Sequence, residues 1–153
     1  MTDNHLSDLR FDSLNLHESM LAGIRDAGFE YCTPIQAVAL PLALQQKDVA
    51  GQAQTGTGKT AAFLIAAYQR LLTQDPKAPV SGQQKQPRIF ILAPTRELAM
   101  QIAKDAEDLG KHTGFSVALA YGGTGYEQQR RQIESGVDVL IGTPGRIIDY
   151  FQQ

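Results

Sequence analysis

The sequence predicts an α/β protein with a parallel sheet covered by helices on both faces. Three apolar runs of strand length, near residues 88–93, 116–120 and 137–141, alternate with segments whose apolar residues have helical spacing. A glycine-rich loop at residues 53–60 also separates a short run of small and apolar residues from a strongly helical one. Repeated strand–helix units indicate a parallel sheet, because the connection between parallel strands is usually a helix.

The first half of the chain is predicted to place helices around that loop. Residues 17–27 have apolar residues at helical spacing and precede a glycine. A second helix is expected after Thr33, a typical N-cap, with a bend at Pro41. We expect a buried strand over residues 48–53 and, after the loop, a helix to about residue 72.

The second half is predicted to repeat strand and helix. Residues 74–87 are rich in proline and glutamine and are read as an exposed connector. The helix after residue 94 is expected to carry Leu98, Ile102, Ala106 and Leu109 on one face. A turn over 122–135 is expected to become helical, and a last helix is expected from about Gly145.

Composition narrows the class of protein. The 153 residues carry a net charge of −2 and are 42% hydrophobic, which is typical of a folded domain and makes any nucleic-acid binding a local property. The single cysteine, Cys32, excludes an internal disulfide framework, and His5, His17 and His112 form no zinc-binding pattern. With no signal-peptide pattern or membrane-length apolar run, we expect a cytoplasmic protein without a membrane partner.

The glycine-rich loop has the chemistry of a phosphate site. Its glycines let successive backbone N–H groups point inward at phosphate oxygens. Lys59 would reach the β- and γ-phosphates, and the Thr60 hydroxyl would reach Mg²⁺. A helix that begins directly after the loop adds its N-terminal N–H groups. The loop consists of Ala53, Gln54, Thr55, Gly56, Thr57, Gly58, Lys59 and Thr60.

Three further turns follow predicted strands, and each offers anion-binding groups. In open parallel sheets, ligands bind beyond the carboxyl ends of the strands. Hydroxyls, helix-start N–H groups and arginines at one such edge suit a polyanion with regularly spaced phosphates, which points to nucleic acid. The turns are Pro94-Thr95-Arg96-Glu97-Leu98-Ala99, Gly122-Gly123 and Thr143-Pro144-Gly145-Arg146.

At these residues the chain resembles the DEAD-box RNA helicases. The phosphate loop matches the family's motif I, and the three turns match its motifs Ia, GG and Ib. Residues 28–36 match its Q motif, with Cys32 in place of the usual proline, and Phe11 lies 17 residues before Gly28, where the family has an isolated aromatic. The amino-acid sequence at residues 32–36, 48–60 and 120–123 resembles that of the bacterial RNA helicase B subfamily.

The resemblance implies a fold and a set of ligands. It implies a RecA-like P-loop sheet, with an N-terminal extension over residues 1–36 and a partial ATP-binding domain over 37–153. Gln36 would pair with the adenine of ATP and Phe11 would stack on it. If the chain belongs to that subfamily, RNA-decay proteins are implied as its partners. The RNA backbone would be contacted, without base preference, by Pro94, Thr95, Arg96, Gly122, Gly123, Thr143, Gly145 and Arg146.

The resemblance also implies that two motifs and one domain of the family are absent from this sequence. Neither of the apolar runs 88–93 and 137–142 ends in a carboxylate, and Asp138 and Asp149 are read as surface or capping residues. The family's Asp-Glu-Ala-Asp and Ser-Ala-Thr motifs and its second RecA-like domain do not occur in the sequence, so we expect a gap in the sheet. These 153 residues alone are expected to hydrolyse ATP poorly, not to unwind RNA and to be marginally stable.

Two other classes stay open at this point. A different P-loop enzyme, such as a small kinase or GTPase, would share the phosphate loop but not the Q motif or Pro-Thr-Arg-Glu. A non-catalytic fragment that binds nucleotide or RNA would share all of these motifs. Guanine-specific binding would favour the first class, and binding without turnover would favour the second.

Overall fold

The computed structural model describes residues 6–74, 86–123 and 125–152. The chain divides into two compact units. Met1–Asp75 and Asp108–Thr113 belong to the first, which we call the N-terminal unit; Pro76–Glu107 and Gly114–Gln153 belong to the second, the sheet unit. No helix within the described ranges has both the length and the apolarity needed to span a bilayer.

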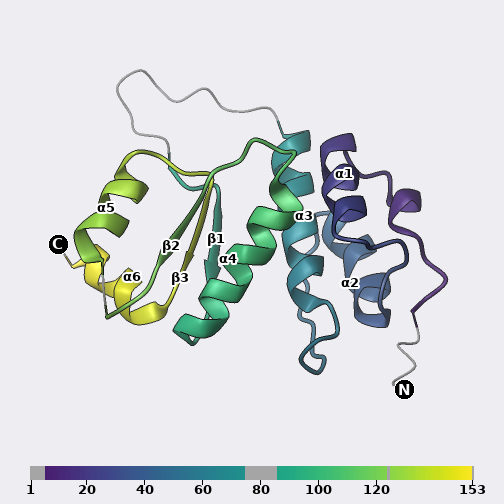
Figure 1. The fold of residues 1–153 in the computed structure, drawn as a ribbon. Helices are drawn as coiled ribbons and strands as arrows, with labels where there is room; N and C mark the ends of the chain where they lie inside the picture. Colours follow the sequence, from purple (N-terminus) through teal and green to yellow (C-terminus); the bar gives the residue numbers. More distant parts are fainter. Residues whose placement is uncertain (1–5, 75–85, 124, 153) are drawn as a thin grey trace. The chain divides into compact units, whose positions relative to one another are not determined.

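Short helices make up the N-terminal unit (Figure 1). α1 begins after His17, whose Nδ1 accepts a hydrogen bond from the Ser19 N–H at 3.2 Å, and it ends just before Gly28, as predicted. Met20 and Ile24 of α1 are fully buried. The elements of this unit are η1 (Phe11–Leu14), α1 (Glu18–Asp26), α2 (Pro34–Leu44) and α3 (Lys59–Thr73).

α2 follows the sequence prediction at its start. Thr33 precedes the helix and Pro34 occupies its first position, where a missing N–H costs nothing. The helix continues through Pro41 to Leu44, and the expected bend at Pro41 stays a prediction. α2 and α3 pack against each other, with Leu40 among the buried side chains.

The predicted buried strand over residues 48–53 is wrong. The segment has no regular secondary structure and its residues are exposed, apart from the half-buried Ala53. Among the described residues it pairs with no strand. A short run of small and apolar residues becomes a strand only beside another strand that takes up its N–H and C=O groups. The gap in the sheet that the family resemblance implies stays a prediction.

Residues 108–113, which include the end of α4 (Arg96–Gly110) and the turn after it, pack closely on α1 within the N-terminal unit. A Cβ atom on Gly23 of α1 would lie 2.1 Å from the Leu109 carbonyl oxygen, so only glycine fits there. The Asp26 carboxylate binds Lys111 Nζ at 2.8 Å and His112 Nε2 at 2.6 Å. The end of this segment is thus fixed to α1 by close backbone contact and by an ion-pair cluster.

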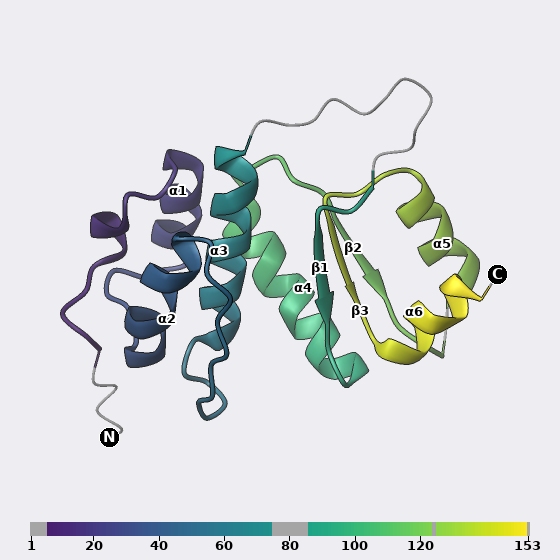
Figure 2. The same cartoon turned by 180° about the vertical axis from the view of Figure 1, so that it is seen from behind.

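A three-stranded parallel sheet forms the centre of the sheet unit, in the order β1-β3-β2. Figures 1 and 2 show α4 on one face of this sheet and α5 and α6 on the other. The predicted α/β class with helices on both faces is therefore confirmed, consistent with part of a RecA-like domain. The elements are β1 (Ile89–Leu92), α4 (Arg96–Gly110), β2 (Val117–Ala120), α5 (Tyr126–Glu134), β3 (Val139–Gly142) and α6 (Pro144–Phe151).

The buried face of α4 differs from the sequence prediction. The buried face of α4 carries Ala99, Ile102 and Ala106, whereas Leu98 is exposed, because the face is shifted by one residue at the helix start. Residues 75–85 of the predicted connector lie outside the described residues.

β1 has one strand neighbour, β3, in the described part of the chain, and Phe90 and Leu92 on β1 are about half exposed.

Candidate nucleotide and nucleic-acid sites

The phosphate loop has the backbone shape that its glycines predict. Gly56 and Gly58 have φ values of 80° and 87°, in the left-handed region that glycine adopts without strain. α3 starts at Lys59, directly after Gly58, so its first N–H groups face the loop. Gln54, Thr55 and Gly56 are exposed.

Side chains of the loop close it upon itself. The Lys59 ammonium group donates a hydrogen bond to the Ala53 carbonyl oxygen, across the loop. The Thr57 hydroxyl donates to the Gln54 carbonyl at 2.7 Å. These two contacts fold the loop back on itself beside the lysine. The donor set fits the phosphates of a nucleotide, and Thr60 lies in the first turn of α3 where its hydroxyl would be a magnesium ligand.

Gln36 links the Q motif to this loop. Its side chain is 3% exposed; its oxygen accepts from the Thr33 N–H at 2.9 Å and its amide donates to the Gly58 carbonyl at 3.0 Å. The Thr33 hydroxyl also donates to the Thr57 carbonyl at 2.7 Å. A carboxamide has two lone pairs and two N–H donors, so these two bonds leave capacity for one acceptor and one donor contact. That is the pair that adenine recognition needs.

The loop also depends on the absence of a side chain at Gly58. A Cβ atom there would lie 2.4 Å from Gln36 Nε2 and 3.2 Å from the Thr33 hydroxyl. Sequence reasoning identified Gln36 and Gly58 separately but not their contact. The capping pattern of threonine followed three residues later by glutamine was the available signal.

Phe11 is packed inside the N-terminal unit. Its side chain is 2% exposed, and its ring centre lies 6.4 Å from that of Phe29. Its backbone N–H donates to the Glu30 carbonyl at 3.1 Å, which fixes it beside the Q motif. An open hollow of about 370 Å³ is lined by this ring together with Leu21 and Ile24 of α1. Stacking of Phe11 on a base stays a prediction.

Cys32 is fully buried in the Q motif, as the composition suggested. Burial raises the pKa of its thiol to about 11. Its backbone N–H donates to the Leu9 carbonyl at 2.8 Å, and its own carbonyl accepts from Ser7. The residue thus packs as a small apolar side chain at a point where two backbone segments meet.

The three turns that follow the strands meet at one edge of the sheet. In register, Leu92 of β1 and Ala120 of β2 both pair with Gly142 of β3, so all three carboxyl ends coincide. The bonds continue past the strands, because the Ala93 N–H donates to Gly142 and the Thr143 N–H donates to Ala120, each at 2.9 Å. The predicted convergence of these three motifs is therefore confirmed for the sheet unit.

Thr95 and Arg96 are exposed at this edge. The Thr95 hydroxyl caps α4 by accepting from the Leu98 N–H at 3.2 Å. The Arg96 side chain is exposed, and its guanidinium lies 4.7 Å from the ring centre of Tyr121. A Cβ atom on Gly123 would be 3.8 Å from Arg96 Nη1, so the Gly-Gly turn runs beside this arginine.

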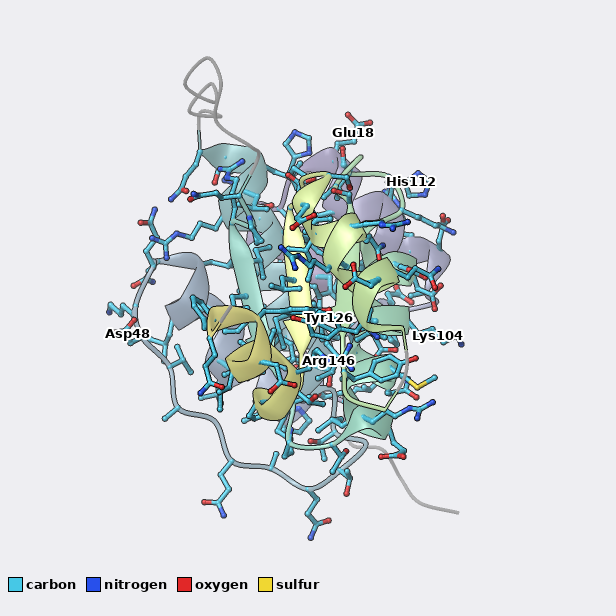
Figure 3. The ribbon with its side chains drawn as sticks, turned by 90° about the vertical axis from the view of Figure 1, so that its left-hand side faces the viewer. Glu18, Asp48, Lys104, His112, Tyr126 and Arg146 are labelled. Carbon is cyan, nitrogen blue, oxygen red and sulfur yellow. The ribbon has the colours of Figure 1, made fainter. Side chains whose placement is uncertain are left out.

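Arg146 is at the same edge but faces the interior. It is 7% exposed and packs against two neighbouring tyrosine rings, 5.0 Å from the centre of Tyr126 and 5.8 Å from that of Tyr150. Its Nη1 donates to the Gln129 carboxamide oxygen at 2.9 Å. Figure 3 labels Tyr126 and Arg146, which lie next to each other. Sequence reasoning missed Gln129 and both tyrosines; only the four-residue spacing of Arg146 and Tyr150 on α6 was a usable signal.

The carboxylates of the sheet unit have structural roles or face solvent. Asp138, which the sequence analysis read as a surface or capping residue, is 4% exposed, so the surface reading is wrong; its Oδ2 accepts from the Ser116 N–H at 2.9 Å, just before β2. Asp149 lies on α6 and is exposed. Across the described ranges, no cluster of three or more His, Cys, Asp or Glu residues could hold a metal. Thr60 is thus the predicted magnesium ligand that this part of the chain supplies.

These features define a P-loop protein of the helicase type, and comparison with known proteins identifies its family. The DEAD/DEAH box helicase family matches residues 33–153. The chain belongs to that family.

Its relatives are longer proteins described as ATP-dependent RNA helicase RhlB. The chain is 61% identical over all 153 residues to the one from Actinobacillus succinogenes, of which it covers 36%. It is 60% identical to the one from Pasteurella multocida and 57% identical to the one from Shewanella halifaxensis, covering 35% of each. The chain therefore spans about a third of the length of these relatives and corresponds to their N-terminal part.

Proposed function

We propose that this chain is the N-terminal portion of an ATP-dependent RNA helicase, and that it binds ATP and the backbone of RNA without sequence preference. The observation that carries the proposal is the pair of built sites. A phosphate loop is hydrogen-bonded to the buried Gln36, and three strand ends present hydroxyls, glycines and Arg96 along one edge. The RhlB relatives support the same activity.

ATP would be held by three kinds of contact. The loop N–H groups and Lys59 would bind the phosphates, and the Thr60 hydroxyl would be the ligand that this chain gives to Mg²⁺. Gln36 would accept from the adenine 6-amino group and donate to N7, whereas guanine presents a carbonyl at position 6. Phe11 would stack on the base once the ring leaves its packed position.

RNA would be held through its sugar and phosphate groups. Thr95, Thr143 and the N–H groups at the Gly-Gly turn and at Gly145 offer donors, while Arg96 adds charge. Such contacts carry no direct base information, so affinity should be nearly independent of sequence. Pro94 would shape the turn before α4, and Arg146 would act at the same edge. The proposal places the activity in the cytoplasm, with RNA-decay proteins as partners of the complete helicase.

Hydrolysis would require groups that these 153 residues do not provide. Phosphoryl transfer needs Mg²⁺ held by an acidic residue and a group that orients the attacking water. Lys59 and Thr60 would bind and orient the phosphates, and they would leave the water without an orienting group. We therefore propose that residues 1–36 and 37–153 form the extension and part of the ATP-binding domain of a helicase, and that alone they bind without turnover.

Nucleotide binding tests the first half of the proposal. The chain should bind a fluorescent ATP analogue more tightly than the matching GTP analogue, and Gln36→Met should reduce both ATP affinity and this preference. Gln45→Met, at the exposed end of the same helix, is the control. Preference for guanine would instead favour a GTPase-like P-loop protein. Sustained phosphate release stimulated by RNA would refute the proposed lack of turnover.

A further inference from the structure

One carboxamide oxygen joins three elements of the sheet unit. Gln129 of α5 accepts from the Tyr121 backbone N–H, just after β2, at 3.1 Å. The same oxygen accepts from Arg146 Nη1 of α6 at 2.9 Å. The two donors use both lone pairs of this oxygen. Gln129 thereby connects the start of the Gly-Gly turn to Arg146.

The environment of Arg146 shows how firmly it is held. Tyr126 and Tyr150 pack with ring centres 4.9 Å apart and planes inclined by 49°, and each ring lies within 6 Å of the guanidinium. The Tyr150 hydroxyl donates to the Tyr126 carbonyl at 3.0 Å, which locks α6 to the start of α5. A guanidinium in this position is desolvated and stacked, so it would have to leave both rings to reach a phosphate.

Tyr121 carries the connection to the surface. Its N–H is bound by Gln129, while its ring lies 4.7 Å from the guanidinium of the exposed Arg96. A stacked guanidinium is oriented before a ligand arrives, so fewer of its rotamers are lost on binding. The chain of contacts therefore runs from Arg146 through Gln129 and Tyr121 to Arg96.

From these contacts we infer that Gln129 is a positioning residue for RNA binding, through which the buried Arg146 and the Tyr121 backbone fix the Gly122–Gly123 turn and Arg96 in their binding geometry. Arg146 acts from inside the fold through this network, and its guanidinium does not contact phosphate. The inference rests on the proposed RNA binding at this edge. It adds a residue of α5, which none of the predicted contacts includes.

The test compares variants of the whole chain in binding to fluorescein-labelled oligo(U) and oligo(A) across a series of salt concentrations. Gln129→Met keeps the side-chain length and removes the acceptor. It should weaken the binding of both RNAs about three- to tenfold. Gln128→Met, exposed on the same helix, should bind as the wild type does. Because Gln129 touches no phosphate, the slope of log K against log salt should not change.

Replacing Arg146 tests whether this residue positions the edge or contacts phosphate directly. Arg96→Met should reduce the salt slope by about 0.7, the value for one phosphate contact on a single strand, whereas Arg146→Met should weaken binding with the slope unchanged. The double variant of Gln129 and Arg146 should bind no more weakly than the weaker single variant. An equal slope change for Arg146→Met and Arg96→Met, or additive losses in the double variant, would overturn the inference.

A measurement without RNA keeps the test decisive if Arg146→Met does not fold. In NMR spectra, the Tyr121 amide proton of the wild type should be shifted downfield by its hydrogen bond, and the Arg146 guanidinium protons upfield by the rings. Gln129→Met should move both, while Gln128→Met should move neither. Unchanged signals in Gln129→Met, or wild-type RNA affinity, would refute positioning by Gln129. A wild-type chain that binds neither RNA would instead refute the proposed function.

Discussion

The side-chain amide of Gln36 donates a hydrogen bond to the carbonyl oxygen of Gly58, 3.0 Å away. Gln36 lies in the first turn of α2, and Gly58 is the last loop residue before α3. The bond makes the shape of the phosphate loop depend on the residue proposed to read adenine. A base that draws Gln36 toward itself would therefore alter the backbone that holds the phosphates, and nucleotide identity and phosphate binding would be coupled within one unit.

Replacing Gly58 by alanine should abolish tight nucleotide binding. The new Cβ would lie 2.4 Å from Gln36 Nε2, and φ of 87° costs a non-glycine residue roughly 1–2 kcal/mol. We expect the dissociation constant for a fluorescent ATP analogue to rise at least about tenfold. Gly51→Ala is the matched control, because its Cβ would meet only Ile35 at an ordinary 3.7 Å. Equal affinity of the two variants would contradict the coupling.

The sequence predicted well that the three turns meet at the carboxyl ends of the strands, because that prediction rests on local signals. Strand length, turn residues and the parallel arrangement together indicate where the carboxyl ends fall, and in the structure Leu92 and Ala120 both pair with Gly142 there. The same reasoning failed for residues 48–53. A strand exists only through its partner, and nothing within a six-residue run reveals whether a partner lies beside it.

The position of the Arg146 side chain could not be predicted for a related reason. Arginine is seldom buried without partners, so a motif that ends in arginine suggests an exposed charge. Here the partners are Tyr126 and Gln129 of α5, seventeen and more residues away in the sequence. Only the packing of α5 beside α6 brings them together. Burial of a charged side chain is thus a tertiary property that its own motif does not encode.

Gly23→Ala should destabilise the N-terminal unit. The added Cβ would lie 2.1 Å from the Leu109 carbonyl oxygen, so the backbone of residues 108–113 or α1 would have to move. Such overpacking usually lowers the free energy of unfolding by about 1–3 kcal/mol. Urea denaturation followed by circular dichroism measures it. Gly145→Ala, also within a helix but with open space around its Cβ, should be neutral or slightly stabilising; an equal loss in both would argue against the contact.

The ion-pair cluster on Asp26 should make stability depend on acid pH. Hydrogen bonds from Lys111, and then from His112, lower the pKa of Asp26 from its ordinary 3.8 to about 2. The folded state therefore holds this carboxylate charged more strongly than the unfolded state does. Its contribution is present above pH 4 and is lost as pH falls from about 4 to about 2.

Asp26→Asn should remove that part of the pH dependence. The free energy of unfolding of the variant, measured by urea denaturation between pH 5 and about 2, should fall less steeply than that of the wild type. Asp149→Asn removes an exposed carboxylate of α6 and should keep the wild-type slope. Parallel curves for wild type and Asp26→Asn would show that the cluster does not contribute to stability in solution.

Arg96→Met should weaken RNA binding to the same extent for every sequence. Arg96 is exposed at the carboxyl edge of the sheet and stacks on Tyr121, and in the proposed function it meets a phosphate, which carries no base information. We expect a several-fold loss of affinity for oligo(U), oligo(A) and a mixed sequence alike in anisotropy titrations. Arg88→Met is the control, because Arg88 lies at the opposite end of β1 and is also exposed. A loss confined to one sequence would indicate base recognition by Arg96, and an equal loss for Arg88→Met would show that the effect comes from net charge and not from this edge.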